Sequence, residues 1–196
     1  MRLNEHTVIT GKSVILTPYV SEHVEQYHKW MQDPFLQEMT ASEPLSIEEE
    51  YDNQKSWRED DEKLTFIILD RESESMIGDV NLFITENEDS AEVWNGEVEI
   101  MIAEESARRK GVATEAIRLF MHYVCEHLPR VQLFFVKIGD SNESSLKLFE
   151  KLDFRFHKHV EVFSETELRQ SVTGALTNSL KEHWADYSAT LINKPP

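Results

Sequence analysis

The sequence has little cysteine, little basic charge and no long apolar run. Its single cysteine, Cys125, excludes an internal disulfide bond and is typical of a reducing compartment such as the cytosol or nucleus. No apolar run approaches the roughly 20 residues that span a membrane, and residues 1–6 lack an apolar signal-peptide core, so we expect neither a membrane segment nor a leader. Repeats and Gly/Ser linkers are also absent, which predicts one domain over 1–196.

Basic residues are scarce beside acidic ones: 20 Lys and Arg against 37 Asp and Glu give a net charge of −17. A nucleic-acid binder needs a basic stripe, and only the short run 108–110 is strongly basic, so we expect no nucleic-acid partner. Acidic residues gather at 48–50, 59–62 and 86–92. Such clusters are most often solvated helix ends and loops. They would also attract a cationic substrate such as an amine or a basic peptide, and the two interpretations are compatible.

Hydrophobic spacing predicts helices and strands along the whole chain. Strands are expected at 14–17, 64–69, 76–84, 92–102, 133–138, 154–163 and 166–172, and helices at 21–33, 46–58, 111–126, 142–151 and about 175–191. The strand at 92–102, the helix at 111–126 and the strand at 133–138 form a right-handed βαβ unit with two parallel strands. Hairpins on either side add antiparallel strands. The predicted fold class is therefore α/β, with a mixed, mostly antiparallel central sheet around a parallel βαβ core.

A basic turn opens the predicted helix at 111–126. With the first helical residues it consists of Arg108, Arg109, Lys110, Gly111, Val112, Ala113 and Thr114. The first N–H groups of a helix have no partner within it, and the helix dipole favours negative charge there. On a protein this acidic, three adjacent cations therefore indicate a site for a phosphate-bearing ligand. The turn fits neither Gly-x-x-x-x-Gly-Lys-Ser/Thr nor Gly-x-Gly-x-x-Gly, which excludes the two commonest phosphate motifs.

The pattern Arg-x-x-Gly-x-Ala after an apolar strand resembles the first signature of the Gcn5-related N-acetyltransferase superfamily. The second signature, Asn-x-x-Ser/Ala followed by Leu-Tyr-Glu-Lys-Leu-Gly-Phe, is matched at 142–154, with Phe149 in place of Tyr and Asp153 in place of Gly. Both signatures fall on the expected elements, and the resemblance covers 14–172. It implies an acyl-CoA N-acyltransferase fold whose parallel βαβ core binds acetyl-CoA.

Four further segments, 1–4, 40–45, 78–83 and 99–104, resemble the N-acetyltransferase 9-like family. That resemblance implies acetylation of the N-terminal amine of α- and β-tubulin, in the cytoplasm and in association with microtubules. No residue by itself indicates tubulin. The alternatives are acetylation of a polyamine or a ribosomal protein, which the acidic charge also suits, and a catalytically silent module that binds acetyl-CoA or microtubules. The oligomeric state is not indicated.

The superfamily resemblance also implies roles at the site. Main-chain groups of Met101 and Ile102 are expected to pair with the pantetheine arm like an added strand, and main-chain amides of 109–114 to hold the pyrophosphate. Asn142 is expected to bond the pantetheine or the approaching substrate, and Ser145 to lie near the cofactor. The other interpretation of Asn142 is a plain helix N-cap, and one side chain could serve both roles.

Acetyl transfer needs a base for the amine proton and a donor to the thioester oxygen. Glu97 and Glu99 lie two residues apart and therefore on one strand face. A carboxylate on a mostly buried strand is costly unless it is functional or paired. We favour Glu99 as the base, directly or through water, with Glu97 second; an edge carboxylate bonded to solvent or lysine is the structural alternative. Phe149 replaces a Tyr that protonates the leaving thiolate in many members, so another group donates or CoA leaves as thiolate.

Histidines offer weaker candidates. His157 and His159 alternate on one strand face, but no third ligand follows at a recognisable spacing, so we expect no metal site. His122 and Cys125 share a helix face, yet a Cys–His acyl-enzyme needs a supporting geometry that the sequence does not indicate.

Overall fold

The computed structural model describes residues 1–87, 90–184 and 188–191. Its strands form one nine-stranded sheet in the order β7-β8-β6-β5-β4-β3-β2-β1-β9. The strands are β1 (Thr7–Thr10), β2 (Val14–Pro18), β3 (Lys63–Asp70), β4 (Met76–Asn87), β5 (Ser90–Ile102), β6 (Val131–Gly139), β7 (Arg155–Val160), β8 (Glu165–Ser171) and β9 (Ser188–Leu191). The pair β5–β6 is parallel and the other pairs are antiparallel. The predicted fold class is confirmed.

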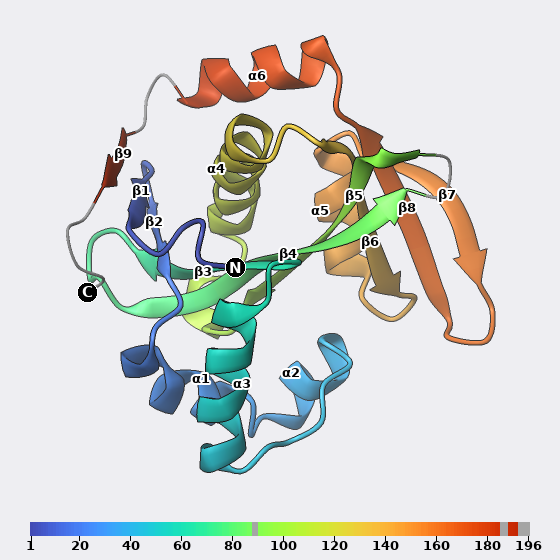
Figure 1. Ribbon diagram of the computed structural model, residues 1–196. Helices are drawn as coiled ribbons and strands as arrows, with labels where there is room; N and C mark the ends of the chain where they lie inside the picture. The colour runs from blue at the N-terminus through green and yellow to red at the C-terminus, as the bar shows by residue number, and fades with distance from the viewer. Residues whose placement is uncertain (88–89, 185–187, 192–196) are drawn as a thin grey trace.

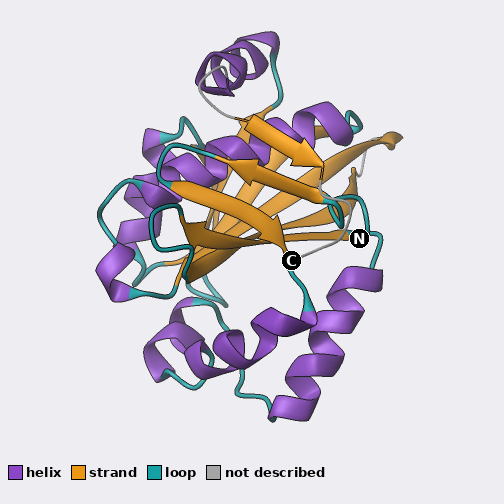
Figure 2. Cartoon of the chain, turned by 90° about the vertical axis from the view of Figure 1, so that its left-hand side faces the viewer, coloured by secondary structure: helices purple, strands orange, loops and turns teal. Residues whose placement is uncertain are grey.

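Helices cover both faces of the sheet (Figures 1 and 2). They are α1 (Val24–Trp30, preceded by a 3₁₀ turn at Ser21–His23), α2 (Pro34–Met39), α3 (Ile47–Glu59), α4 (Val112–His127), α5 (Glu143–Lys151) and α6 (Gly174–Trp184). The crossover helix α4 packs on the face that carries Phe66, Leu82 and Val98, and α1 packs on the opposite face against Ile67 and Met101. Alternate residues of β3, β4 and β5 therefore point to different layers.

Local capping signals in the sequence set two of the helix starts. Ser46 Oγ accepts from the Glu49 backbone N–H, and the Glu49 carboxylate accepts from the Ser46 N–H, so a capping box precedes α3, where a helix is expected at 46–58. Pro34, expected to end a helix, instead begins α2, with the Asp33 side chain as the N-cap. Proline is well suited to the first helical position because its missing N–H would have no partner there.

The C-terminal helix is shorter than the sequence predicts. We expected a helix at about 175–191, but α6 ends at Trp184 and residues 188–191 form strand β9, which pairs antiparallel with β1. Positions 185–187 of the expected helix lie outside the described residues. Apolar spacing was a poor guide here because an edge strand is stabilised by pairing with a distant partner. In the described ranges, no helix is both long and apolar enough to cross a bilayer.

Candidate active site

The parallel strands β5 and β6 separate halfway along their length. Their paired residues run from Trp94 with Val131 to Glu97 with Phe135, and both strands then continue unpaired with each other. A cleft of about 1250 Å³ opens there. Its walls are the second half of β5, the second half of β6 with the start of α5, the loop after α2, and the β7–β8 hairpin. The site therefore lies where the sheet itself is open.

The register of β5 decides which of its main-chain groups face this opening. The N–H of Ala103 donates to Ile77 in β4 (2.9 Å), whereas the N–H of Trp94 donates to Arg130 on the β6 side (2.7 Å). Because main-chain direction alternates along a strand, the amides of Ile100 and Ile102 point toward β6. Met101, expected to pair with a cofactor through its main chain, is matched with Asp79 in β4. The free strand edge consists of the even-numbered residues.

The basic turn follows this edge directly. The Arg108 guanidinium donates to the carbonyls of Ile102 and Ala103, both at 2.9 Å, so this arginine holds the end of β5 in place. Arg109 and Lys110 are exposed. Gly111 has φ of +84°, a left-handed conformation that residues with a Cβ avoid.

The first turn of α4 is open to an anion. Gly111, its N-cap, makes no side-chain cap hydrogen bond, so in the described part of the chain the first N–H groups of α4 keep their donors free. The buried Val112 fixes the helix to the core, whereas Ala113 and Thr114 are partly exposed. Free N–H groups, the positive end of a helix dipole and two exposed cations together form a site for a phosphate group.

The second signature forms the opposite wall. Asn142 Oδ1 accepts from the Ser145 N–H (3.1 Å), so Asn142 is the N-cap of α5, and both residues line the cleft. Phe149 lies at the same wall, 3% exposed, with its ring edge against Phe154. Asp153 has φ of +66°, which explains why glycine is usual at this position. Asp is one of the residues that tolerate this conformation.

Two carboxylates stand on the floor of the cleft. Glu97 and Glu99 line it from β5, as expected from their spacing. Lys137 Nζ in β6 lies 2.7 Å from Glu97 Oε2, an ion pair across the separating strands. Glu99 has no ion pair or side-chain hydrogen bond among the described residues. Its side chain is open to the cleft, but the surrounding protein displaces bulk water, and this desolvation raises the pKa of Glu99 to about 7.

The floor also holds polar residues that the sequence analysis did not single out. Asn81 lies directly across from Glu99 and donates to Asp79 Oδ2 at 2.6 Å. Tyr27 in α1 also donates to that oxygen (3.4 Å), while Asp79 Oδ1 has no partner. Burial raises the pKa of Asp79 to about 6. Lys63 in β3 completes the floor. The signal for these residues was the alternation of polar and apolar positions in β3 and β4.

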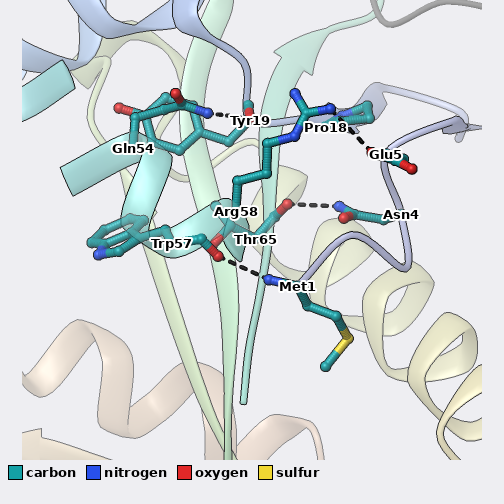
Figure 3. A pocket seen from close by; sticks show the side chains of 9 residues that line it. All are labelled: Met1, Asn4, Glu5, Pro18, Tyr19, Gln54, Trp57, Arg58 and Thr65. Atoms are coloured by element: carbon teal, nitrogen blue, oxygen red, sulfur yellow. Dashed lines mark hydrogen bonds and ion pairs between the residues drawn. The ribbon is translucent and has the colours of Figure 1, made fainter. Parts of the chain in front are cut away.

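A second pocket, which shares Trp57 with the cleft, lies between the N-terminal segment, α3 and β3 (Figure 3). Its volume of about 20 Å³ has room for about one water molecule. The amine of Met1 donates to the Trp57 carbonyl (2.9 Å), and Asn4 Nδ2 donates to the Thr65 carbonyl (2.7 Å). These bonds fix the N-terminal segment against α3 and β3. The pocket is too small for a substrate.

Of the weaker candidates, His122 and Cys125 lie on α4 and do not line the cleft, whereas His159 contacts Asp140, which does. The ring of His122 packs on Trp184, and burial raises the pKa of Cys125 to about 11, which disfavours a reactive thiolate. His159 lies 2.8 Å from Asp140, and within the described ranges no group of three or more His, Cys, Asp or Glu side chains is placed to hold a metal ion.

A parallel strand pair that opens over free main-chain donors, next to a basic helix start, is the arrangement of an acetyltransferase. Residues 13–155 match the family described as the acetyltransferase (GNAT) domain, and the chain belongs to this family. The chain is 46% identical over 183 residues to the N-acetyltransferase 9-like protein of Dictyostelium discoideum, covering 84% of this chain and 85% of the relative.

Other relatives carry a more specific name. The alpha/beta-tubulin-N-acetyltransferase 9 of Homo sapiens is 46% identical over 184 residues, covering 88% of this chain and 87% of the relative. The Drosophila melanogaster protein of the same name is 45% identical over 192 residues, covering 93% of this chain and 95% of the relative. The family resemblance in the sequence is confirmed.

Solved structures share the fold. A spermidine N-acetyltransferase from Vibrio cholerae, in complex with CoA and spermine, superimposes with a TM-score of 0.72 at 18% identity, covering 86% of this chain and 99% of that one. RimL, a ribosomal L7/L12 alpha-N-protein acetyltransferase in complex with CoA, gives 0.71 at 12% identity, covering 84% and 98%. At these identities the likeness extends to the fold alone.

Proposed function

We propose that this protein transfers the acetyl group of acetyl-CoA to the N-terminal amine of α- and β-tubulin, in the cytoplasm. The assignment of tubulin as the acceptor is based on relatives that are about 45% identical over most of the chain and carry that activity in their names. The chemistry rests on one observation above all: Glu99, a carboxylate without an ion pair, stands on the floor of the open cleft with its pKa raised to about 7. Such a group is suited to take a proton near neutral pH.

The free donors on β5 and α4 fit the acetyl donor. We assign the main-chain groups of Ile100 and Ile102 to the pantetheine arm, in place of those of Met101. The amides at the start of α4, with Arg109 and Lys110, would hold the pyrophosphate. Acetyl-CoA supplies the acetyl group as a reactive thioester.

The protein's own residues supply the rest of the chemistry. An amine must be neutral to attack, and Glu99 removes its proton, directly or through a water molecule. A strand amide of Ile100 or Ile102 donates to the oxygen that becomes negative at the reacting carbonyl. Phe149 has no proton to give, so we assign the departure of CoA as a thiolate. Asn142, already the α5 cap through Oδ1, offers its side-chain N–H groups to the ligand.

The acidic floor also fits a cationic acceptor. Glu97, Glu99 and Asp79 gather where the amine must arrive, and a protein amine reaches the site as an ammonium group at neutral pH. A polyamine has the same charge, so charge alone does not separate the two acceptors. A tubulin peptide and a polyamine must therefore be compared directly as substrates.

The test combines purified protein and acetyl-CoA with one acceptor at a time: a peptide copied from a tubulin N-terminus, the same peptide with its N-terminus blocked, and spermidine. Release of free thiol reports turnover, and mass spectrometry locates the acetyl group. We expect turnover with the free-amine peptide alone. Turnover with spermidine only would reassign the enzyme to polyamines. Tight CoA binding without turnover on any amine would identify a silent module.

A further inference from the structure

Lys63 is a buried lysine without an ion-pair partner. Its residue is 3% exposed, and its Nζ lies 3.0 Å from the centre of the Trp57 ring and 4.0 Å from the centre of the Phe83 ring. Among the described residues, no carboxylate lies within 4 Å of this ammonium group and no hydrogen bond of it is found. Lysine is almost never buried unless it is paired, so this position needs a reason.

The reason lies along the floor of the cleft. Lys63 is matched across β3 and β4 with Phe83, which is matched in turn with Glu97 in β5. Two residues further along these strands, and therefore on the same face, Asn81 in β4 is matched with Glu99 in β5. The lysine therefore shares one sheet face with these carboxylates, about two strand spacings, roughly 10 Å, from β5. It lines the same cleft.

The floor carries more negative than positive charge. Glu97 is neutralised by Lys137, the nearest cation on the opposite wall. Asp79 accepts hydrogen bonds from the neutral groups of Asn81 and Tyr27. Lys158, also in the cleft lining, is paired with Glu167. Among the described residues of the lining, Lys63 is therefore the lysine left for Glu99 and Asp79. The two aromatic rings stabilise the ammonium group through cation–π contacts and hold it away from a direct ion pair with Glu99. A base in a direct ion pair would be less available to a substrate proton.

We propose that Lys63 is a positioning residue that keeps the Glu99 carboxylate ionised, and thus able to accept a proton, without contacting it. This inference rests on the proposed role of Glu99 in acetyl transfer. Lys63 acts through its charge at a distance, and the Trp57 and Phe83 rings fix where that charge lies. The neighbouring acids Glu97 and Asp79 would otherwise favour the protonated form of Glu99.

The charges around Glu99 shift its pKa in both directions. Desolvation by the surrounding protein raises the pKa of Glu99 most; Glu97 and Asp79 raise it further, while Lys63 and, less strongly, Lys137 lower it. Glu38, another acid in the cleft lining, comes from α2, and the Tyr27 hydroxyl from α1 stays neutral because burial raises its pKa well above 10. Burial in turn lowers the pKa of Lys63 to about 8, so the lysine is still a cation at neutral pH.

The experiment compares Lys63→Met, which removes the charge, with Lys63→Arg, which keeps it. Lys137→Met serves as the control for loss of a cation whose main partner is Glu97. For each protein we would follow kcat/KM for the acceptor peptide against pH and titrate the Glu99 carboxyl by ¹³C NMR in the CoA complex. Lys63→Met should move both midpoints upward by about one pH unit, as expected for charges roughly 10 Å apart at an effective dielectric of about 20. At pH values below the wild-type midpoint, an upward shift of one pH unit lowers the rate of Lys63→Met about tenfold.

Lys63→Arg should keep both midpoints near the wild-type values, and Lys137→Met should move them less than Lys63→Met does. Unchanged midpoints in Lys63→Met with CoA binding intact would overturn the proposal. So would the loss of the folded, CoA-binding state in both Lys63→Met and Lys63→Gln, since the lysine would then serve the fold. The NMR titration needs no turnover. A shift there without acetylation of any tubulin peptide would uphold the electrostatic role of Lys63 and reject only the proposed acceptor.

Discussion

Lys137 and Glu97 form an ion pair across the point where β5 and β6 separate, with Nζ 2.7 Å from Oε2. The pair links the two walls of the cleft at its narrow end. It also distinguishes the two carboxylates of β5, because Glu97 is bound to a cation while Glu99, two residues further on, is not. The structure thereby favours Glu99 over Glu97 as the base.

Glu99→Gln should lower kcat for the acceptor peptide by about 10²–10⁴-fold, the range usual for loss of a general base. Glu97→Gln removes the partner of Lys137 but not the base, so we expect a loss smaller than tenfold. Both substitutions keep the size of the side chain, and both variants should bind CoA like the wild type. The checks are initial rates with the tubulin peptide and calorimetric titration with CoA. A larger loss in Glu97→Gln than in Glu99→Gln would reverse the assignment.

The raised pKa of Asp79 predicts that the stability of the protein depends on pH. Its pKa is 3.8 in a model peptide and about 6 when buried in the fold, so the folded state binds more protons between these values. Stability contributed by this group is therefore present below about pH 4 and is lost as pH rises through about 6.

Asp79→Asn removes this titration and keeps the shape. The free energy of unfolding of the variant, relative to wild type, should rise by about 2–3 kcal/mol between pH 4 and pH 8. Urea unfolding at several pH values measures this difference. Asp61→Asn, at an exposed carboxylate before β3, is the control for loss of one surface charge. The same dependence on pH in Asp79→Asn and Asp61→Asn would show that burial of Asp79 does not cause the effect.

Signals contained in a short stretch of sequence predicted local structure that the fold contains. The basic turn at 108–113, the Asn142 cap and the Ser46–Glu49 capping box each depend on residues within a few positions of one another. Lys63 and Asp79 join Glu99 only through the register of three strands, and periodicity shows which residues share a face without showing which strands are neighbours. Residues 188–191 form a strand for the same reason, since the partner β1 is almost the whole chain away.

Gly78 is required for close contact between β4 and β5. A Cβ at this position would lie 1.9 Å from the Met101 carbonyl oxygen and 3.1 Å from Ile102 Cα, both main-chain atoms that cannot turn aside. Gly78→Ala should therefore push β5 away where its free edge ends, with a loss of about 1–3 kcal/mol of stability and weaker CoA binding. Gly139→Ala, in open space on β6, is the control. Equal melting temperatures for the two variants would contradict this explanation.

Substitutions of Gly111 test the backbone conformation of the basic turn without a steric clash. A Cβ here would meet no atom within 4 Å, so only the φ of +84° opposes a side chain. Gly111→Ala should cost about 1–2 kcal/mol of stability and weaken CoA binding, because relaxing the strain would redirect the first amides of α4. Asn tolerates left-handed backbone better than Ala, so Gly111→Asn should lose less of both.

Gly174→Ala supplies the control, since Gly174 also has open space around it and is not at positive φ. We expect its stability and its affinity for CoA to stay near the wild-type values. Melting curves and calorimetric titration with CoA measure both quantities for all three variants. If Gly111→Ala and Gly111→Asn lost affinity equally, the added side chain itself would be the obstacle. The left-handed backbone would then not be what aims the amides of α4 at the pyrophosphate.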